Sequence, residues 1–197
     1  MKVNMTKRSL PAVWMPRFVQ FDEDGRTDLK NAISRNGGQM RICETAGLIP
    51  YSVWKRFELF RELVKELLKF NNHGMLSKSD IDENSFTVPA PADLTEREHE
   101  RLSELLRTFG GTNTVEDLLF VNGRHLVENL SLLVELTEYM HSDMMSKEPP
   151  FSHEILMPTK DQLLDDKRDD LVAGIRNYGG FELVANIIPE CIITQLT

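Results

Sequence analysis

The side chains that most often carry enzyme chemistry are not arranged in a catalytic pattern in this chain. No histidine has a second one four residues away, the spacing that puts two metal ligands on one helix face, and surface or turn positions are expected for all five: His73, His99, His125, His141 and His153. A nucleophile elbow, a phosphate-binding glycine loop and a Cys–His pairing are also missing. We therefore expect no catalytic residue, no cofactor and no metal, and hence a protein that is not an enzyme.

Two other groups of reactive side chains also favour structural roles. Four aspartates cluster around Lys167 and Arg168, where acids at a helix start are stabilised by the helix dipole: Asp165, Asp166, Asp169 and Asp170. The two cysteines, Cys43 and Cys191, are too few for a disulfide framework. Cys43 falls on a predicted buried face, where a free cysteine acts as a small hydrophobe.

Composition places the chain among globular proteins. It has 197 residues, of which 41% are hydrophobic and 27% charged, and no apolar run is long enough to cross a bilayer. The charge is split: residues 1–73 carry 13 Lys and Arg against 8 Asp and Glu, whereas residues 74–197 carry 10 against 23. Such asymmetry suggests oppositely charged partners at the two ends or head-to-tail contact between copies; the alternative is that the charges only form solvated faces.

The elements that position these residues are predicted by an internal repeat. Gly-Gly pairs stand at Gly37–Gly38, Gly110–Gly111 and Gly179–Gly180, and aligning the chain on them produces a shared pattern, P-x4-[FL]-x7-L-x3-[IL]-x3-G-G-x3-[IV]. The Leu and the Ile or Leu four residues apart form the apolar stripe of a short helix. We expect the first glycine to close that helix in a left-handed conformation and the second to allow close backbone approach, after which a second short helix follows.

A third, longer helix is predicted in the first two copies. It runs from Tyr51 to about Phe70 in copy one, and from about Gly123 to Met140 in copy two, with an apolar face at spacings of three and four. The predicted core positions are Val53, Phe57, Phe60, Val64 and Leu67 in the first, and Leu126, Leu130, Leu133, Thr137 and Met140 in the second. Copy three has no such helix before the sequence ends at Thr197, so either the last unit is a truncated cap or the natural chain is longer than this sequence.

The predicted fold is therefore all-α, with tandem three-helix repeats, two full and a truncated third, joined by long linkers. The expected organisation is a basic N-terminal arm (1–15), repeat one (16–73), a linker (74–88), repeat two (89–141), a linker (142–157) and a partial repeat three (158–197). The arm lacks the apolar core of a secretory signal; it is either an extended basic arm or the remnant of an organellar presequence.

The first copy also has a helix-turn-helix spacing, with Cys43, Gly47 and Val53 at the small, turn and apolar positions. Basic residues on the second helix alternate with Glu58, Glu62 and Glu66, which indicates a salt-bridged face rather than a nucleic-acid surface. If this copy does bind nucleic acid, or an acidic partner, the expected contacts are Arg35, Arg41, Lys55 and Arg56.

Two stretches, GRTDLKNAISRNGG from Gly25 and KRDDLVAGIRNYGG from Lys167, resemble a repeat of plant and algal plastid proteins. In that family a Gly-Arg, Asp-Leu, Ala-Ile and Gly-Gly series precedes a Gly-Leu and a Trp-containing helix, here Gly47–Leu48 and Trp54. The resemblance implies a helical adaptor in the plastid stroma or on the stromal face of a plastid complex, without an active site; otherwise a cytoplasmic location is expected.

Two functions remain open. The first is a non-catalytic helical adaptor or structural subunit that docks protein subunits of a larger assembly, such as a photosynthetic or gene-expression complex. The second is a helix-turn-helix-like protein that binds nucleic acid through its basic first repeat.

Overall fold

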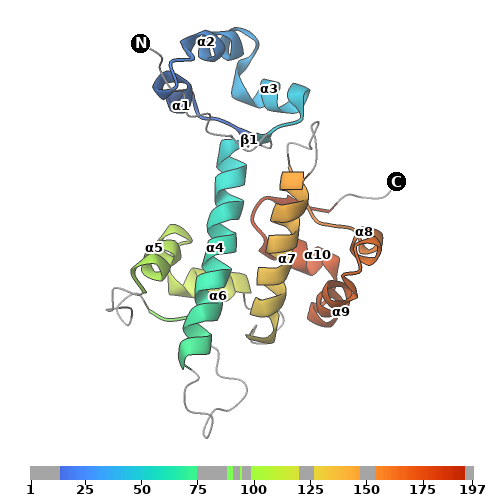
Figure 1. Ribbon diagram of the computed structural model, residues 1–197. Coiled ribbons are helices and arrows are strands. Elements are labelled where there is room, and N and C mark those ends of the chain that lie inside the picture. Colours follow the sequence, from blue (N-terminus) through green and yellow to red (C-terminus); the bar gives the residue numbers. More distant parts are fainter. Residues whose placement is uncertain are drawn as a thin grey trace, which may run out of the picture. The chain divides into compact units, whose positions relative to one another are not determined.

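The computed structural model describes residues 14–74, 88–90, 94, 99–119, 127–146 and 154–193, and these residues are mostly helical (Figure 1). The helices are α1 (Phe18–Glu23), α2 (Thr27–Arg35), α3 (Gly38–Ala46), α4 (Tyr51–Gly74), α5 (Glu100–Thr108), α6 (Thr112–Leu119), α7 (Val127–Ser146), α8 (Lys160–Asp165), α9 (Asp169–Tyr178) and α10 (Phe181–Ile187). The predominantly helical character predicted from the sequence is confirmed. Within the described ranges, no helix combines the length and apolarity needed to cross a bilayer.

Among the described residues, four two-residue strands accompany the helices and were not predicted. They are β1 (Trp14–Met15), β2 (Ile49–Pro50), β3 (Ile155–Leu156) and β4 (Cys191–Ile192). β1 pairs in parallel with β2, and β3 lies beside β4. Strands of two residues are too short to produce a readable alternation of apolar and polar residues.

The chain divides into two compact units. Unit 1 comprises Met1–Trp54 and His141–Ile155, and unit 2 comprises Lys55–Met140 and Leu156–Thr197. The division falls inside α4 and inside α7, so each long helix contributes residues to both units.

Unit 1 contains α1, α2 and α3 around a small core of Met15, Phe21, Ile33 and Cys43. The Gln39 side chain, in the first turn of α3, donates a hydrogen bond to the Pro16 carbonyl at 2.7 Å and so ties α3 to the segment before α1. Ile33 is buried as the apolar stripe predicts, but Leu29 on the same stripe is 37% exposed. A nine-residue helix that packs mainly through one turn leaves the rest of its stripe in solvent.

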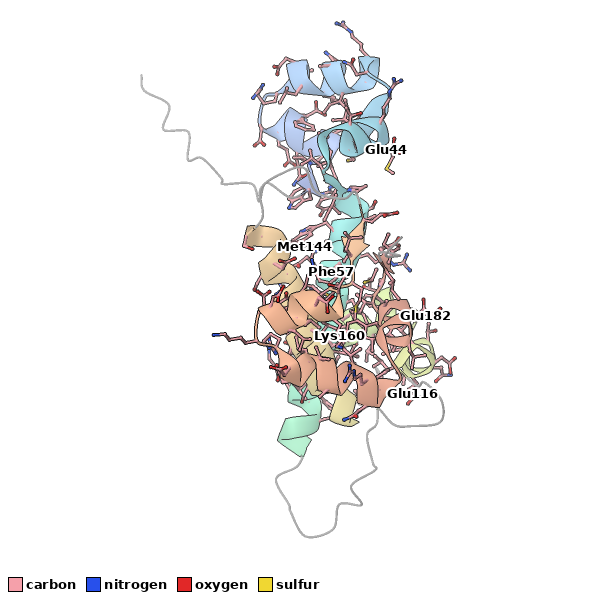
Figure 2. All side chains as sticks on the ribbon, turned by 90° about the vertical axis from the view of Figure 1, so that its right-hand side faces the viewer. Glu44, Phe57, Glu116, Met144, Lys160 and Glu182 are labelled. Carbon is pink, nitrogen blue, oxygen red and sulfur yellow. The ribbon has the colours of Figure 1, made fainter. Side chains whose placement is uncertain are left out.

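In unit 2, α4 and α7 supply many of the fully buried side chains. Phe57, Phe60, Leu63, Val64 and Leu67 of α4 are fully buried (Phe57 is labelled in Figure 2). On α7 the same holds for Leu130, Leu133, Leu136 and Thr137, with Met140 3% exposed. The Thr137 hydroxyl is satisfied because it donates to the Leu133 carbonyl at 2.8 Å.

The long helices extend past their predicted ends. α4 reaches Gly74 rather than Phe70, and α7 reaches Ser146 rather than Met140. The expected beginning of α7 near Gly123, together with Leu126, lies outside the described residues, as does nearly all of the expected linker 74–88. The expected linker 142–157 is partly regular structure, since it contains the end of α7 and all of β3.

The remaining helices of unit 2 form two further groups. α5 contacts α6, and α9 contacts both α8 and α10. The buried residues of the second group include Met157, Leu163, Ile175 and Ala185. Of the C-terminal apolar residues, Ile187 and Ile188 are buried, whereas Ile192 and Ile193 remain 38% and 39% exposed.

Candidate interaction surfaces

Each glycine doublet joins the end of one short helix to the start of another. All six glycines have positive φ: Gly37 +96° and Gly38 +88°, Gly110 +93° and Gly111 +94°, Gly179 +131° and Gly180 +103°. α5 and α9 end in the same way, since the second glycine's N–H donates to the carbonyl five residues earlier, Leu106 at 2.8 Å and Ile175 at 2.9 Å. This is the hydrogen bond of a Schellman helix end.

The first glycine of each doublet also has a close neighbour. A Cβ at Gly37, Gly110 or Gly179 would lie 2.6–3.0 Å from the side chain four residues later, which is Arg41, Thr114 or Leu183. The second glycines face open space. The close approach was expected at the second glycine; it lies at the first, because the side chain four residues later, in the first turn of the following helix, comes back over that position.

Two of the predicted contact residues, Arg35 and Arg41, flank the first doublet. Arg35 is the last residue of α2, Arg41 lies in the first turn of α3, and both are exposed. Neither forms an ion pair with another residue of the described ranges. The first turn of α3 contains no acid, whereas α10 has Glu182 at the corresponding place (Figure 2). The first turn of α3 therefore carries the positive charge of Arg41 and no acid of its own.

The other two predicted contacts, Lys55 and Arg56, lie in the second turn of α4 and belong to unit 2. Both are exposed, but the Arg56 guanidinium is 2.9 Å from the Glu190 carboxylate. One of the four cations is thus already matched within the chain.

The helix-turn-helix spacing corresponds to a real turn between helices. Cys43 is fully buried, Gly47 is left-handed with φ +61°, and the Leu48 N–H closes α3 by donating to the Cys43 carbonyl at 2.9 Å. However, every side chain of α4 from residue 57 to 68 is buried or half-buried. A recognition helix must offer a free face along several turns, so this stretch of α4 is unsuited to enter a DNA groove.

The charges on α4 are matched largely by other helices of unit 2. Arg61 contacts Glu58 at 2.8 Å and Glu138 of α7 at 2.6 Å, and Lys65 contacts Glu138 at 2.5 Å. Arg101 of α5 makes two hydrogen bonds to Glu62, at 2.6 and 2.5 Å. Salt bridges are present on this face, as the alternating charges predicted, but most of the partners come from distant segments and the face is half-buried instead of solvated.

This matching shifts the titration of the acids involved. The hydrogen bonds from Arg101 hold the pKa of Glu62 below its ordinary value. At the start of α9, hydrogen bonds from Arg168 lower the pKa of Asp170 to about 2. Arg168 also contacts Glu135 of α7 at 2.8 Å, and Asp166 accepts a hydrogen bond from the Tyr139 hydroxyl of α7 at 2.5 Å, so this segment is tied to α7.

The described histidines and cysteines occupy structural positions. His99 lies 5.3 Å from the Phe70 ring, and His141 lies 5.6 Å from the Trp54 ring. Both cysteines are free thiols, and burial raises the pKa of Cys191 to about 12. In the part of the chain that the structure describes, no group of three or more His, Cys, Asp and Glu side chains could hold a metal ion.

Comparison with protein-family models, curated proteins and solved structures finds no match to this chain.

Tyr178 is a buried residue that the sequence did not single out. Tyr178 precedes its glycine doublet as Phe109 precedes another, and it is 8% exposed with no hydrogen-bond partner for its hydroxyl among the described residues. Burial raises the pKa of this phenol. An aromatic residue before a doublet predicts burial, but nothing in the sequence indicates that the hydroxyl goes unpaired.

Proposed function

We propose that this protein is a non-catalytic adaptor built from tandem helical modules, which docks protein subunits of a larger assembly. The observation that carries the proposal is the recurrence of the same core positions at the spacing of the glycine doublets. In copy one they are Met15, Phe21 and Ile33, in copy two Val88, Leu94 and Leu106, and in copy three Met157, Leu163 and Ile175. All nine are at most 9% exposed.

Hydrogen bonds recur at the same spacing and add support. Thr112 donates to the Pro89 carbonyl at 2.9 Å, as Gln39 donates to that of Pro16. Arg168 pairs with Asp170 as Arg26 pairs with Asp28. Modules with a shared frame and different surfaces are typical of repeat proteins that bind other proteins.

The resemblance to plastid repeat proteins extends the proposal to location. On this basis the adaptor acts in the plastid stroma or on the stromal face of a plastid complex. Expressing the chain with a C-terminal fluorescent fusion in plant cells tests this part separately, since a purely cytoplasmic signal would contradict the location but not the adaptor role.

The adaptor role is tested by purifying the full chain with its bound proteins and rebuilding the complex from pure components. We expect a defined stoichiometry and a loss of binding in a surface variant that keeps its helical content. Arg35→Glu with Arg41→Glu is such a variant, and Lys160→Glu on α8, another exposed cation, is the matched control. A chain that binds no protein, or equal loss in the control, would contradict the proposal.

Nucleic-acid binding is the second candidate, and the unmatched Arg35 and Arg41 at the first doublet favour it. Phosphate contacts make such binding steeply dependent on salt. Fluorescence anisotropy with labelled DNA and RNA over a range of salt concentrations decides: tight, salt-dependent binding that Arg35→Glu with Arg41→Glu removes would support this candidate, and a flat, weak response would discard it.

A further inference from the structure

Unit 2 exposes one large aliphatic side chain on each strand of a two-stranded sheet and a third directly after β4. Leu156 of β3 is 39% exposed, Ile192 of β4 38% and the adjacent Ile193 39%. The Met157 N–H, directly after Leu156, donates to the Ile192 carbonyl at 2.8 Å, which places Leu156 beside Ile192. We refer to these three residues as the β3–β4 apolar patch. Within the described ranges each strand has one neighbour, so the sheet keeps unpaired edges where another strand could add.

The corresponding sheet in unit 1 is covered. Tyr51 directly follows β2, and its ring lies 5.0 Å from that of Trp14 on β1. The Arg17 guanidinium lies 4.9 Å above the Tyr51 ring, and Pro50 is buried. Aromatic side chains and a cation therefore pack beside the β1–β2 sheet. Among the described residues, the β3–β4 apolar patch has no such cover.

The first residues of the chain have the chemistry to cover it. Met1, Val3 and Met5 alternate with Lys2, Asn4 and Thr6, which is the period of a strand with one apolar face. Residues 1–13 include Lys2, Lys7 and Arg8 and no acid, whereas residues 74–197 carry 10 Lys and Arg against 23 Asp and Glu. This difference in charge would steer the arm of one molecule toward the acidic part of another.

The size of the patch also suits a single strand. A stable interface between whole subunits buries about 800 Å² per partner, more than three partly exposed side chains present. Strand addition needs less apolar area, because main-chain hydrogen bonds contribute to the affinity and alternate side chains provide the fit.

We propose that residues 1–6 of one copy add as a strand to the β3–β4 sheet of a second copy, with Met1, Val3 and Met5 against the β3–β4 apolar patch. The contact is head to tail: each molecule offers its arm to one neighbour and its patch to another. This inference goes beyond the adaptor function and does not depend on it, because a chain that fails to self-associate could still dock partner proteins.

The test is sedimentation velocity on the full chain from low micromolar to submillimolar concentration. The wild type is expected to form larger species as concentration rises. Deleting residues 2–9, or replacing Ile192→Asp, should weaken self-association at least about tenfold, which corresponds to the loss of one good apolar contact. Leu164→Asp is the matched control, because Leu164 is 37% exposed on α8 and lies outside the patch.

A second measurement fixes the source of the strand. A fluorescent peptide of residues 1–13 should bind the chain that lacks residues 2–9, and not the same chain with Ile192→Asp. Lys7→Glu with Arg8→Glu, which reverses two positive charges of the arm, should also weaken self-association. A wild type that stays monomeric at every concentration would overturn the proposal. This holds even if the peptide binds the chain that lacks residues 2–9, because that result would mean that the arm covers its own molecule. Equal loss in the Leu164→Asp control would also overturn it.

Discussion

Replacing Tyr178→Phe is expected to stabilise the protein. The Tyr178 ring is 8% exposed, and its hydroxyl has no hydrogen-bond partner among the described residues. A buried polar group without a partner costs about 1–3 kcal/mol, because it gives up its hydrogen bonds to water on folding. Phenylalanine keeps the ring and removes that cost, and Phe109 before the second doublet indicates that a ring alone suits this position. We expect the free energy of unfolding to rise by about 1–2 kcal/mol.

The measurement is urea denaturation followed by circular dichroism, with thermal melting as a second readout. In a chain of this length each 1 kcal/mol raises Tm by about 2–4 °C. Tyr139→Phe is the matched control: the Tyr139 hydroxyl donates to Asp166 at 2.5 Å, so the same atom removed there should leave stability unchanged or lower it. A Tyr178→Phe variant less stable than the wild type would refute the reasoning, since it would mean that the hydroxyl makes a favourable contact.

The pH dependence provides an independent check. Burial raises the pKa of Tyr178 in the folded state above the ordinary value of 10.0. Folding then favours the neutral phenol. The free energy of unfolding is therefore fully retained below pH 10 and falls as the pH rises further, by up to about 1.4 kcal/mol per pH unit. The Tyr178→Phe variant should lack this part of the alkaline loss. An identical alkaline slope in both proteins would show that Tyr178 ionises freely when folded.

Three further predictions concern the doublets and the ion pairs. In urea denaturation, Gly110→Ala should lower the free energy of unfolding by about 2 kcal/mol or more, and Gly111→Ala by about 1–2 kcal/mol. Both variants force alanine to adopt a positive φ, but only the first also displaces a neighbouring side chain. Equal losses would contradict the close contact at Gly110. A double-mutant cycle of Glu62→Gln with Arg101→Met should give a coupling of about 0.2–1 kcal/mol that falls with added salt, as expected for half-exposed partners; no coupling at low salt would mean that the pair does not form. The Asp170 carboxyl should titrate in NMR with a pKa of about 2, and this pKa should shift upward in Arg168→Met. The lowered pKa stabilises the fold above the ordinary value of 3.8, and this stabilisation is lost as pH falls toward 2. An Asp170 pKa that does not move in the variant would contradict the pairing of Arg168 with Asp170.

Local signals in the sequence were sufficient for much of the helical structure. Leucine and isoleucine four residues apart followed by a glycine doublet predicted short helices and their ends, and the apolar face of α4 was read correctly from Phe57 to Leu67. Helix periodicity and positive-φ glycines are properties of a few neighbouring residues, which is why they can be read without knowledge of the fold.

Contacts between distant segments could not be read in this way. Glu138 lies 77 residues from Arg61 in sequence, and Glu62 lies 39 from Arg101. The charge split therefore suggested outside partners, contact between copies or solvated faces, whereas part of the charge is matched inside the chain. Of the predicted contact residues, Arg56 proved to be engaged by Glu190, while Arg35 and Arg41 kept their exposed charge.

The space next to the first glycine of each doublet has a consequence for how this scaffold could diversify. Arginine, threonine and leucine fill that space in the three turns, so the backbone tolerates a long cation, a small hydroxyl or a branched hydrocarbon there. Substitution at position 41, 114 or 183 can thus change the side chain presented beside one glycine doublet while the two glycines of that turn stay unchanged. These three sites are natural starting points for engineering libraries, in which new specificity could be selected one bend at a time.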